Sequence, residues 1–457
     1  MYRAIFFLTF TIYYTIVSAQ TIRGKLSVLP NQSIKLEGFN GLKTYQISTT
    51  TSDSLGNFKL NYEKADYGVG YLMSADNKPL IVILSGEDIE IKGEALSAAE
   101  TIRIITGQEN QWFAQYAAEH PKREQVLGAW AYLDKTYTID SLFAGQKTPK
   151  KAIQAEKQRI HAEDVAFINK LPKDSYVSWF LPTRKLLSSV SAVAQHRPEE
   201  IPATLKALRS IDYSDSRLYK SGLLSDAIDS HVWFIENSMS PLDSVHALLI
   251  RSIDIILSQL KMDERKYNDI TDYLFGLLEQ RSMFPVAEYL SLKVLEDRSC
   301  TVDIKLANKL EGYRKLKIGN KAPDITFGAH SYFPEHIQAG SLSAIDAAYK
   351  VVVFAANWCN HCQEVMPKLA HHYTKWRAKG IEVVLVSLDE NMGEFTTFAA
   401  PLPFTATCDY KKWESQPVKD YHIFGTPSFY LLKNNLEIVL KPSTVEQIDA
   451  WIDWHVK

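Results

Sequence analysis

The sequence predicts a multidomain protein with an N-terminal β-sandwich, a central α-helical region and a C-terminal α/β domain. Three observations support this order: short alternating apolar runs near the N-terminus, apolar residues spaced by three or four in the middle, and a buried strand leading into a helix near the C-terminus. A chain of 457 residues has room for two or three domains with their own cores. We place a signal peptide at residues 1–19, the β-sandwich domain at 20–95, the helical domain at 96–316 and the α/β domain at 317–457.

The first residues have the features of an export signal. Arg3 precedes an apolar stretch over residues 4–17, and the small residues Ser18 and Ala19 precede a predicted cleavage site. The apolar stretch is short for a membrane span. We therefore expect export to the periplasm, with a retained N-terminal membrane anchor as the alternative.

Alternation of apolar and polar residues marks strands between residues 21 and 93. Ser33–Glu37 and Asp88–Gly93 alternate, and Leu80–Leu84 is a short apolar run. Turn signals such as Asn-Gly and Ser-Gly separate these runs. The pattern predicts an antiparallel sandwich.

Helical spacing replaces alternation after residue 96. Thr148, followed by Pro149, is predicted to cap a helix that ends near Lys170. A second helix is predicted to begin after Ser240-Pro241. Its apolar face consists of Leu242, Val245, Leu249, Ile253, Ile256 and Leu260.

The segment Trp358-Cys359-Asn360-His361-Cys362 is the most informative feature of the chain. Two cysteines separated by two residues can close a disulfide and open it again. The apolar run 350–355 predicts a buried strand before them, and a helix is predicted over 359–379, with a kink at Pro367 and a stop at Gly380. This strand–turn–helix context predicts a redox pair.

The helix start predicts different roles for the two cysteines. Cys359 would face unpaired backbone N–H groups and the positive end of the helix dipole, so we expect it to be the thiolate nucleophile. Cys362, one turn further, would resolve the mixed disulfide. A protonated His361 would stabilise the thiolate, so His361→Pro is expected to lower the reduction potential and raise the Cys359 pKa. Trp358 and Asn360 are further positions expected to tune the pair.

Three other interpretations of the two cysteines compete with the redox pair. Structural zinc needs a second Cys or His pair, and none has zinc spacing nearby. Covalent haem needs a histidine after the second cysteine, where Gln363 stands. A permanent structural disulfide is disfavoured in so short a loop. We therefore expect neither a metal nor a bound cofactor, only the redox-active Cys359–Cys362 disulfide.

The last third of the chain, about 317–457, resembles the thioredoxin superfamily, specifically the TlpA/ResA-like periplasmic thiol–disulfide oxidoreductases. Ile318–Asp324 resembles the N-terminal motif of that group, and Gly425–Phe429 resembles its loop with a cis proline. The resemblance implies that Pro427 is cis and that the Thr426 backbone lies against the cysteines and pairs with an extended substrate segment. A trans Pro427 that only opens a strand is the alternative.

Two positions depart from the pattern of these families. Val365 stands where many TlpA/ResA-like members have Glu, and Val353 stands where thioredoxin has a buried carboxylate. The proton acceptor for Cys362 is therefore open. Glu390, after the next predicted strand, resembles an acidic position near the active site of some members. A solvated carboxylate at the end of a strand is the alternative.

The other two of the four cysteines are Cys300 and Cys408. Cys408 is expected to be a buried thiol in a strand, whereas Cys300 lies among polar residues and is expected to be accessible. A bridge between them would tether the α/β domain to the preceding region. The sequence leaves this pairing open.

The net charge of −2 and the absence of a long basic stripe argue against nucleic-acid binding. Lys147, Lys150 and Lys151 are expected to form part of a solvated face.

These features together predict an exported thiol–disulfide oxidoreductase that exchanges disulfides with periplasmic proteins. The resemblance favours a reductase that receives electrons from a membrane thiol transporter, whereas His361 favours the oxidase or isomerase direction. A hypothesis of another class is a non-catalytic peptide-binding or envelope-assembly protein with a thioredoxin-like scaffold. The sequence assigns no oligomeric state.

Overall fold

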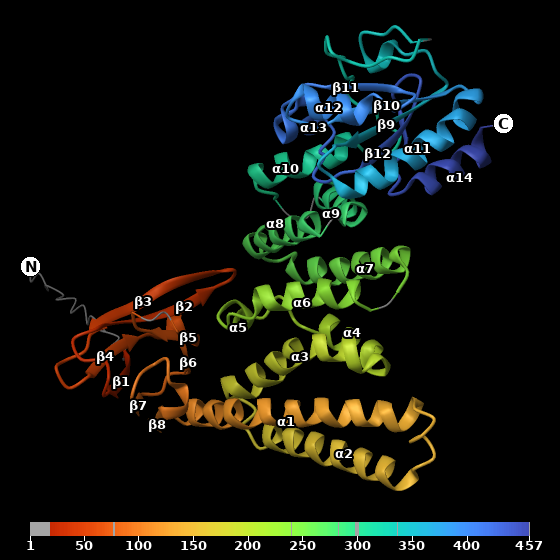
Figure 1. The fold of residues 1–457 in the computed structure, drawn as a ribbon. Coiled ribbons are helices and arrows are strands. Elements are labelled where there is room, and N and C mark those ends of the chain that lie inside the picture. The colour runs from red at the N-terminus through yellow and green to blue at the C-terminus, as the bar shows by residue number, and fades with distance from the viewer. Residues whose placement is uncertain are drawn as a thin grey trace, which may run out of the picture. The chain divides into compact units, whose positions relative to one another are not determined.

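The computed structural model describes residues 19–75, 78–238, 240–281, 283–297, 301–335 and 337–456 (Figure 1). Sheets, helices and an α/β domain follow one another along the chain, which confirms the predicted fold class. The chain divides into two compact units, Met1–Leu248 and Leu249–Lys457, and each is described by itself. The finer domain boundaries stay predictions, and the predicted signal peptide lies, apart from Ala19, outside the described residues.

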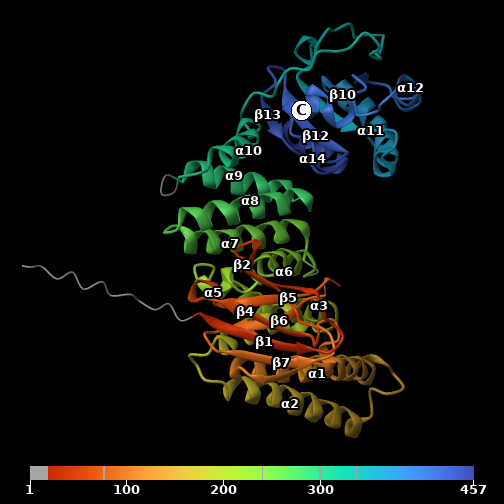
Figure 2. The same cartoon turned by 90° about the vertical axis from the view of Figure 1, so that its left-hand side faces the viewer.

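Two four-stranded sheets form the N-terminal part of the first unit, with the orders β4-β1-β7-β8 and β3-β2-β5-β6. Figure 2 shows most of these strands in red and orange. Side chains of both sheets, among them Ile22, Leu36 and Val82, share one buried cluster, so the sheets form a sandwich. The strands are β1 (Gln20–Leu26), β2 (Ser33–Asn40), β3 (Lys43–Thr51), β4 (Asn57–Tyr62), β5 (Gly68–Met73), β6 (Leu80–Leu84), β7 (Ile89–Gly93) and β8 (Arg103–Thr106).

Two features of the sandwich differ from the sequence prediction. β1 pairs in parallel with β7, with Ile22 opposite Ile89, so the sandwich is not antiparallel throughout. The sandwich also contains a strand beyond residue 95, namely β8. Gly107 follows β8 and leads into the first helix, with a φ of 101°. Alternation identifies the buried face of a strand but not its neighbour in the sheet, so these pairings had no local signal.

Helices follow the sandwich in the first unit. Thr148 is not the N-cap of α2, because the helix already begins at Lys147 and Gln146 holds the cap position. Pro149 is tolerated in the first turn, where backbone N–H groups have no intrahelical partner. The end of α2 at Asn169 agrees with the prediction. The helices are α1 (Gln108–Ile139), α2 (Lys147–Asn169), α3 (Tyr176–His196), α4 (Ile201–Arg209), α5 (Ser216–Tyr219) and α6 (Leu224–Glu236).

Helix α7 (Leu242–Leu260) contains the division between the units and begins directly after Pro241, as predicted. Its predicted apolar face is buried, except that Leu242 is exposed. In the second unit, α8 packs on α9 and α9 packs on α10. These helices are α8 (Glu264–Gln280), α9 (Phe284–Glu296) and α10 (Ile304–Lys315).

A five-stranded sheet with the order β11-β10-β9-β12-β13 forms the centre of the α/β domain. β9, β10 and β11 are parallel, whereas β12 is antiparallel to β9 and to β13. The strands are β9 (Tyr349–Ala355), β10 (Ile381–Ser387), β11 (Thr405–Cys408), β12 (Ser428–Lys433) and β13 (Ile438–Leu440). The helices are α11 (Asn360–Ala378), α12 (Met392–Ala399), α13 (Gln416–Asp420) and α14 (Val445–His455).

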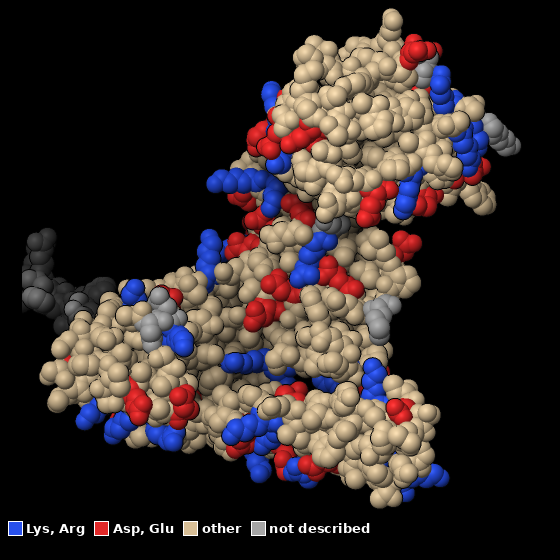
Figure 3. Space-filling model, viewed as in Figure 1, with Lys and Arg blue, Asp and Glu red and all other residues tan. Residues whose placement is uncertain are grey.

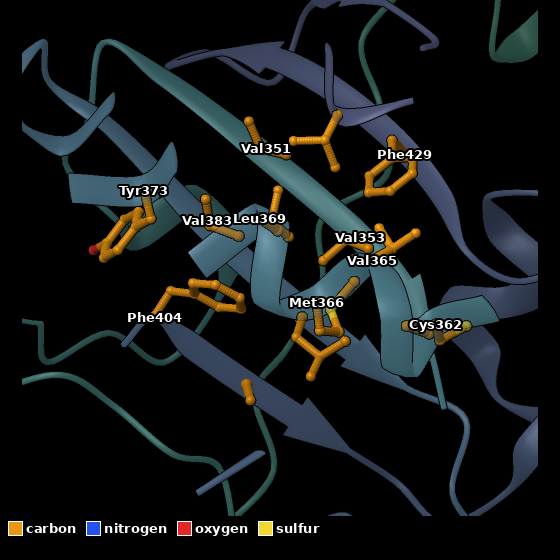
Figure 4. Packing of buried hydrophobic residues seen from close by; sticks show 14 of the residues in the cluster. Val351, Val353, Cys362, Val365, Met366, Leu369, Tyr373, Val383, Phe404 and Phe429 are labelled. Atoms are coloured by element: carbon orange, nitrogen blue, oxygen red, sulfur yellow. The ribbon is translucent and has the colours of Figure 1, made fainter. Parts of the chain in front are cut away.

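Both faces of the central strand β9 are buried. Val351 and Val353 belong to one apolar cluster, together with Leu369 of α11 (Figure 4). Val352 and Phe354 point to the opposite face and belong to a second cluster. A strand that is covered on both faces needs an apolar run without alternation, which is the pattern of the sequence here.

The strand–turn–helix predicted around the two cysteines is confirmed. β9 ends at Ala355 and α11 begins at Asn360, which leaves Cys359 at the N-cap. Pro367 lies within α11, and Gly380 follows the helix with a φ of 77°, a conformation typical of helix C-termini.

Charges of both signs are interspersed on the face that Figure 3 shows. Within the described parts of the chain, none of the helices combines the length and the apolar character needed to cross a membrane.

Candidate redox site

A disulfide joins Cys359 and Cys362, whose Cα atoms are 5.2 Å apart. The backbone N–H of Cys362 points at the sulfur of Cys359, with 3.2 Å between N and Sγ. Cys359 is partly accessible, whereas Cys362, in the first turn of α11, is fully buried (Figure 4). Of the two sulfurs, only that of Cys359 is therefore accessible to a partner protein; the division of roles between the two cysteines stays a prediction.

The loop before β12 lies against this sulfur. The Thr426–Pro427 peptide bond is cis, as the resemblance implied. The carbonyl oxygen of Thr426 is 3.4 Å from Sγ of Cys359. The structure thus brings together two segments that are far apart in the sequence, and the Thr426 backbone borders the reactive sulfur.

A buried carboxylate holds the turn before Cys359. Asp389 is fully buried, accepts a hydrogen bond of 2.9 Å from the backbone N–H of Asn357 and accepts another of 2.7 Å from the hydroxyl of Ser387. Burial raises the pKa of Asp389, and these hydrogen bonds partly offset the rise. The carboxylate therefore anchors the turn to the end of β10.

The sequence predicts a role near the active site for the next residue, Glu390, instead. The side chain of Glu390 is 58% exposed and forms an ion pair of 3.2 Å with Lys412, so its position matches the solvated alternative. Both acids follow a strand that is buried along its whole length. The acidic pair itself was the available signal, but only the tertiary structure shows which carboxylate turns inward.

The residues around the cysteines are mostly exposed. Nδ1 of His361 lies 3.8 Å from a carboxylate oxygen of Glu364, and these two side chains are 69% and 76% exposed. The indole N–H of Trp358 donates to the carbonyl of Leu388 at 3.3 Å, and Asn360 is exposed. The contact between His361 and Glu364 therefore lies in water, where ion pairs are weak.

The two valines that replace family carboxylates are buried, Val353 in β9 and Val365 in α11. Cys408 is a buried free thiol in β11, as predicted, and burial raises its pKa. Cys408 is therefore not bridged to Cys300, which itself lies outside the described residues. Among the described residues, no group of three or more His, Cys, Asp or Glu side chains could hold a metal ion.

This arrangement suits thiol–disulfide chemistry. When the disulfide is reduced, the Cys362 N–H and the start of α11 can stabilise negative charge on Cys359. The buried Cys362 is within bonding distance to displace a partner from Cys359.

Comparison with known proteins agrees with this geometry. A family model described as the AhpC/TSA family matches residues 318–441. The thiol-disulfide oxidoreductase ResA of Oceanobacillus iheyensis is 27% identical over 154 residues, covering 32% of this chain and 78% of the relative. Tryparedoxin of Trypanosoma brucei brucei is 37% identical over 90 residues, covering 19% of this chain and 62% of the relative.

Among solved structures, the thioredoxin domain of a thiol-disulfide oxidoreductase from Bacteroides vulgatus is 22% identical, covers 31% of this chain and 99% of that structure, and has a TM-score of 0.28. The family match contains the cysteines, the buried Asp389 and the cis-proline loop. Its named relatives support an oxidoreductase activity. The C-terminal region of this chain is a thioredoxin-like domain of the AhpC/TSA family.

Proposed function

We propose that this protein is an exported thiol–disulfide oxidoreductase that reduces disulfides of periplasmic proteins through Cys359 and Cys362. The proposal rests on one observation above all: a partly accessible Cys359 caps α11, with the Thr426 carbonyl 3.4 Å from its sulfur and Cys362 buried one turn behind. Export is inferred from the predicted signal peptide.

The proposed reaction transfers two electrons from the cysteine pair to a substrate disulfide. The Cys359 thiolate attacks one substrate sulfur, forms a mixed disulfide and releases the first substrate thiolate. The Cys362 thiolate then attacks Cys359, forms the internal disulfide and releases the second substrate thiolate. The substrate leaves reduced and the enzyme leaves oxidised, so an external dithiol must reduce it before the next cycle; a membrane thiol transporter is the candidate donor.

The reductase direction is favoured by the surroundings of His361. An oxidase would need strong stabilisation of the Cys359 thiolate, which makes the reduced enzyme the more stable form. The imidazole is largely exposed and faces the Glu364 carboxylate, so it supplies little of that stabilisation.

Insulin reduction by the full chain, with dithiothreitol as the electron donor, tests this function. We expect Cys359→Ser to abolish the catalysed rate. Cys408→Ser is the matched control and should keep it, since Cys408 is a buried free thiol outside the pair. Turnover that survives Cys359→Ser would reject the proposed nucleophile, whereas no catalysed turnover by the native chain would favour the peptide-binding scaffold. Cys362→Ser should accumulate mixed disulfides with substrate proteins, which identifies them.

A further inference from the structure

A groove lies close to the redox pair. Its volume is about 470 Å³, and its lining residues are Trp413, Val418, Lys419, His422, Ile423 and Phe424. Most of these side chains are apolar. Burial lowers the pKa of His422, so its ring adds no charge to the groove at neutral pH. The Lys419 ammonium is already paired with Glu414 at 2.5 Å.

The two aromatic walls of the groove, Trp413 and Phe424, lie near residues that border the reactive sulfur of Cys359. The Trp413 ring is 6.1 Å from the ring of Trp358, the residue directly before Cys359. Phe424 stands two residues before Thr426, whose carbonyl borders the sulfur. Trp358, Trp413 and Phe424 are 42%, 37% and 49% exposed. Exposed aromatic side chains clustered at a reactive centre are typical of a surface that receives a partner.

Helices outside the family match support this groove from behind. The Phe284 ring at the start of α9 stacks on Phe424 with 6.4 Å between centroids. The Tyr313 ring in α10 is 6.2 Å from the ring of His422. Gly312 allows this approach, because a Cβ atom there would lie 2.0 Å from the His422 ring. The ion pair between Glu288 and Lys441 joins α9 to the α/β domain, because Lys441 directly follows β13. Helices α9 and α10 therefore hold the groove in shape.

We propose that this groove binds an aliphatic or aromatic side chain two residues from the reactive cysteine in an extended segment of the substrate protein. The inference rests on the proposed function. If the substrate cysteine faces Cys359 beside Thr426, two further residues of extended chain cover about 6–7 Å along the Thr426–Phe424 segment. Alternate residues of an extended segment face the same side, so that second side chain points toward Phe424. Pairing with the Thr426 backbone cannot distinguish side chains, whereas the groove can.

Single-turnover reduction of paired peptides by the reduced full chain tests the inference. Each peptide carries one disulfide, and the two differ only by Leu or Ser two residues from the cysteine, with both chain directions represented. Hydroxyethyl disulfide, which has no side chain to place, is the reference substrate. We expect the Leu peptide to be preferred about tenfold, because it reaches the half-maximal rate at a lower peptide concentration.

Two variants and one control locate the preference. Phe424→Ala and Gly312→Ala should each reduce the Leu preference to about twofold or less, the first by removing a wall and the second by displacing His422. Trp454→Ala, at a residue that is 85% exposed on α14, should leave the preference unchanged.

Equal rates for the two peptides, with hydroxyethyl disulfide still reduced, would overturn this inference and leave the proposed function in place. A Leu preference that both groove variants retain would overturn it too. Failure to reduce any disulfide would overturn the proposed function itself.

Discussion

The exposed His361–Glu364 pair allows a quantitative prediction about redox tuning. The two side chains lie 3.8 Å apart beside the first turn of α11, and both are mostly in water. An attraction between two solvent-exposed opposite charges contributes about 0.2–1 kcal/mol. For a two-electron couple, 1.4 kcal/mol corresponds to about 30 mV. At a pH at which the imidazole is protonated, we therefore expect His361→Gln to lower the reduction potential by about 5–20 mV, because it then removes a positive charge that stabilises the Cys359 thiolate.

The matched variant Glu364→Gln should shift the potential in the opposite direction by a similar amount. Equilibration of the full chain with dithiothreitol or glutathione redox buffers, followed by tryptophan fluorescence, measures both shifts. Each shift should shrink in 1 M salt, where the Debye length is about 3 Å. Iodoacetamide labelling should show the Cys359 pKa raised in His361→Gln and lowered in Glu364→Gln. Shifts of the same sign in the two variants, or a salt-independent shift, would refute this electrostatic account.

Three further predictions concern stability. Burial would raise the pKa of Asp164, but hydrogen bonds from His120 and Lys185 outweigh it and lower the pKa to about 2, so about 2 kcal/mol of stability, present above pH 4, should disappear as the pH falls toward 2. Urea unfolding should show this loss in the native chain and not in Asp164→Asn. Asp389→Ala should cost about 1–3 kcal/mol by leaving the Asn357 N–H unpaired, and Asp389→Asn should cost less; equal costs would contradict the hydrogen-bond explanation. Leu369→Ala should cost about 2–5 kcal/mol in chemical unfolding, and a cost below 1 kcal/mol would show that the cluster collapses around the cavity.

Local sequence patterns determined the elements of the redox site. The apolar run of β9, the cysteines after it and Gly380 were enough to predict the strand, the turn and the helix, because each depends on residues close in the chain. The cis state of Pro427 came from resemblance to a family motif.

Several features were decided only by the tertiary structure. The parallel pairing of β1 with β7 joins segments more than sixty residues apart. The residues of a strand do not indicate which other strand lies beside it in the sheet. Asp389 and Glu390 are chemically alike and adjacent, so their roles differ only because one faces the turn before Cys359 and the other faces Lys412.

The groove beside the cysteines is another feature that could not be predicted from the sequence alone. The cysteine motif itself is local, and the sequence alone located it. The wall at Phe424 depends on its stacking against Phe284, which lies in a helix far earlier in the chain. Periodicity reports which side of an element is buried, whereas a binding surface depends on which elements meet, and that is decided only when the chain packs.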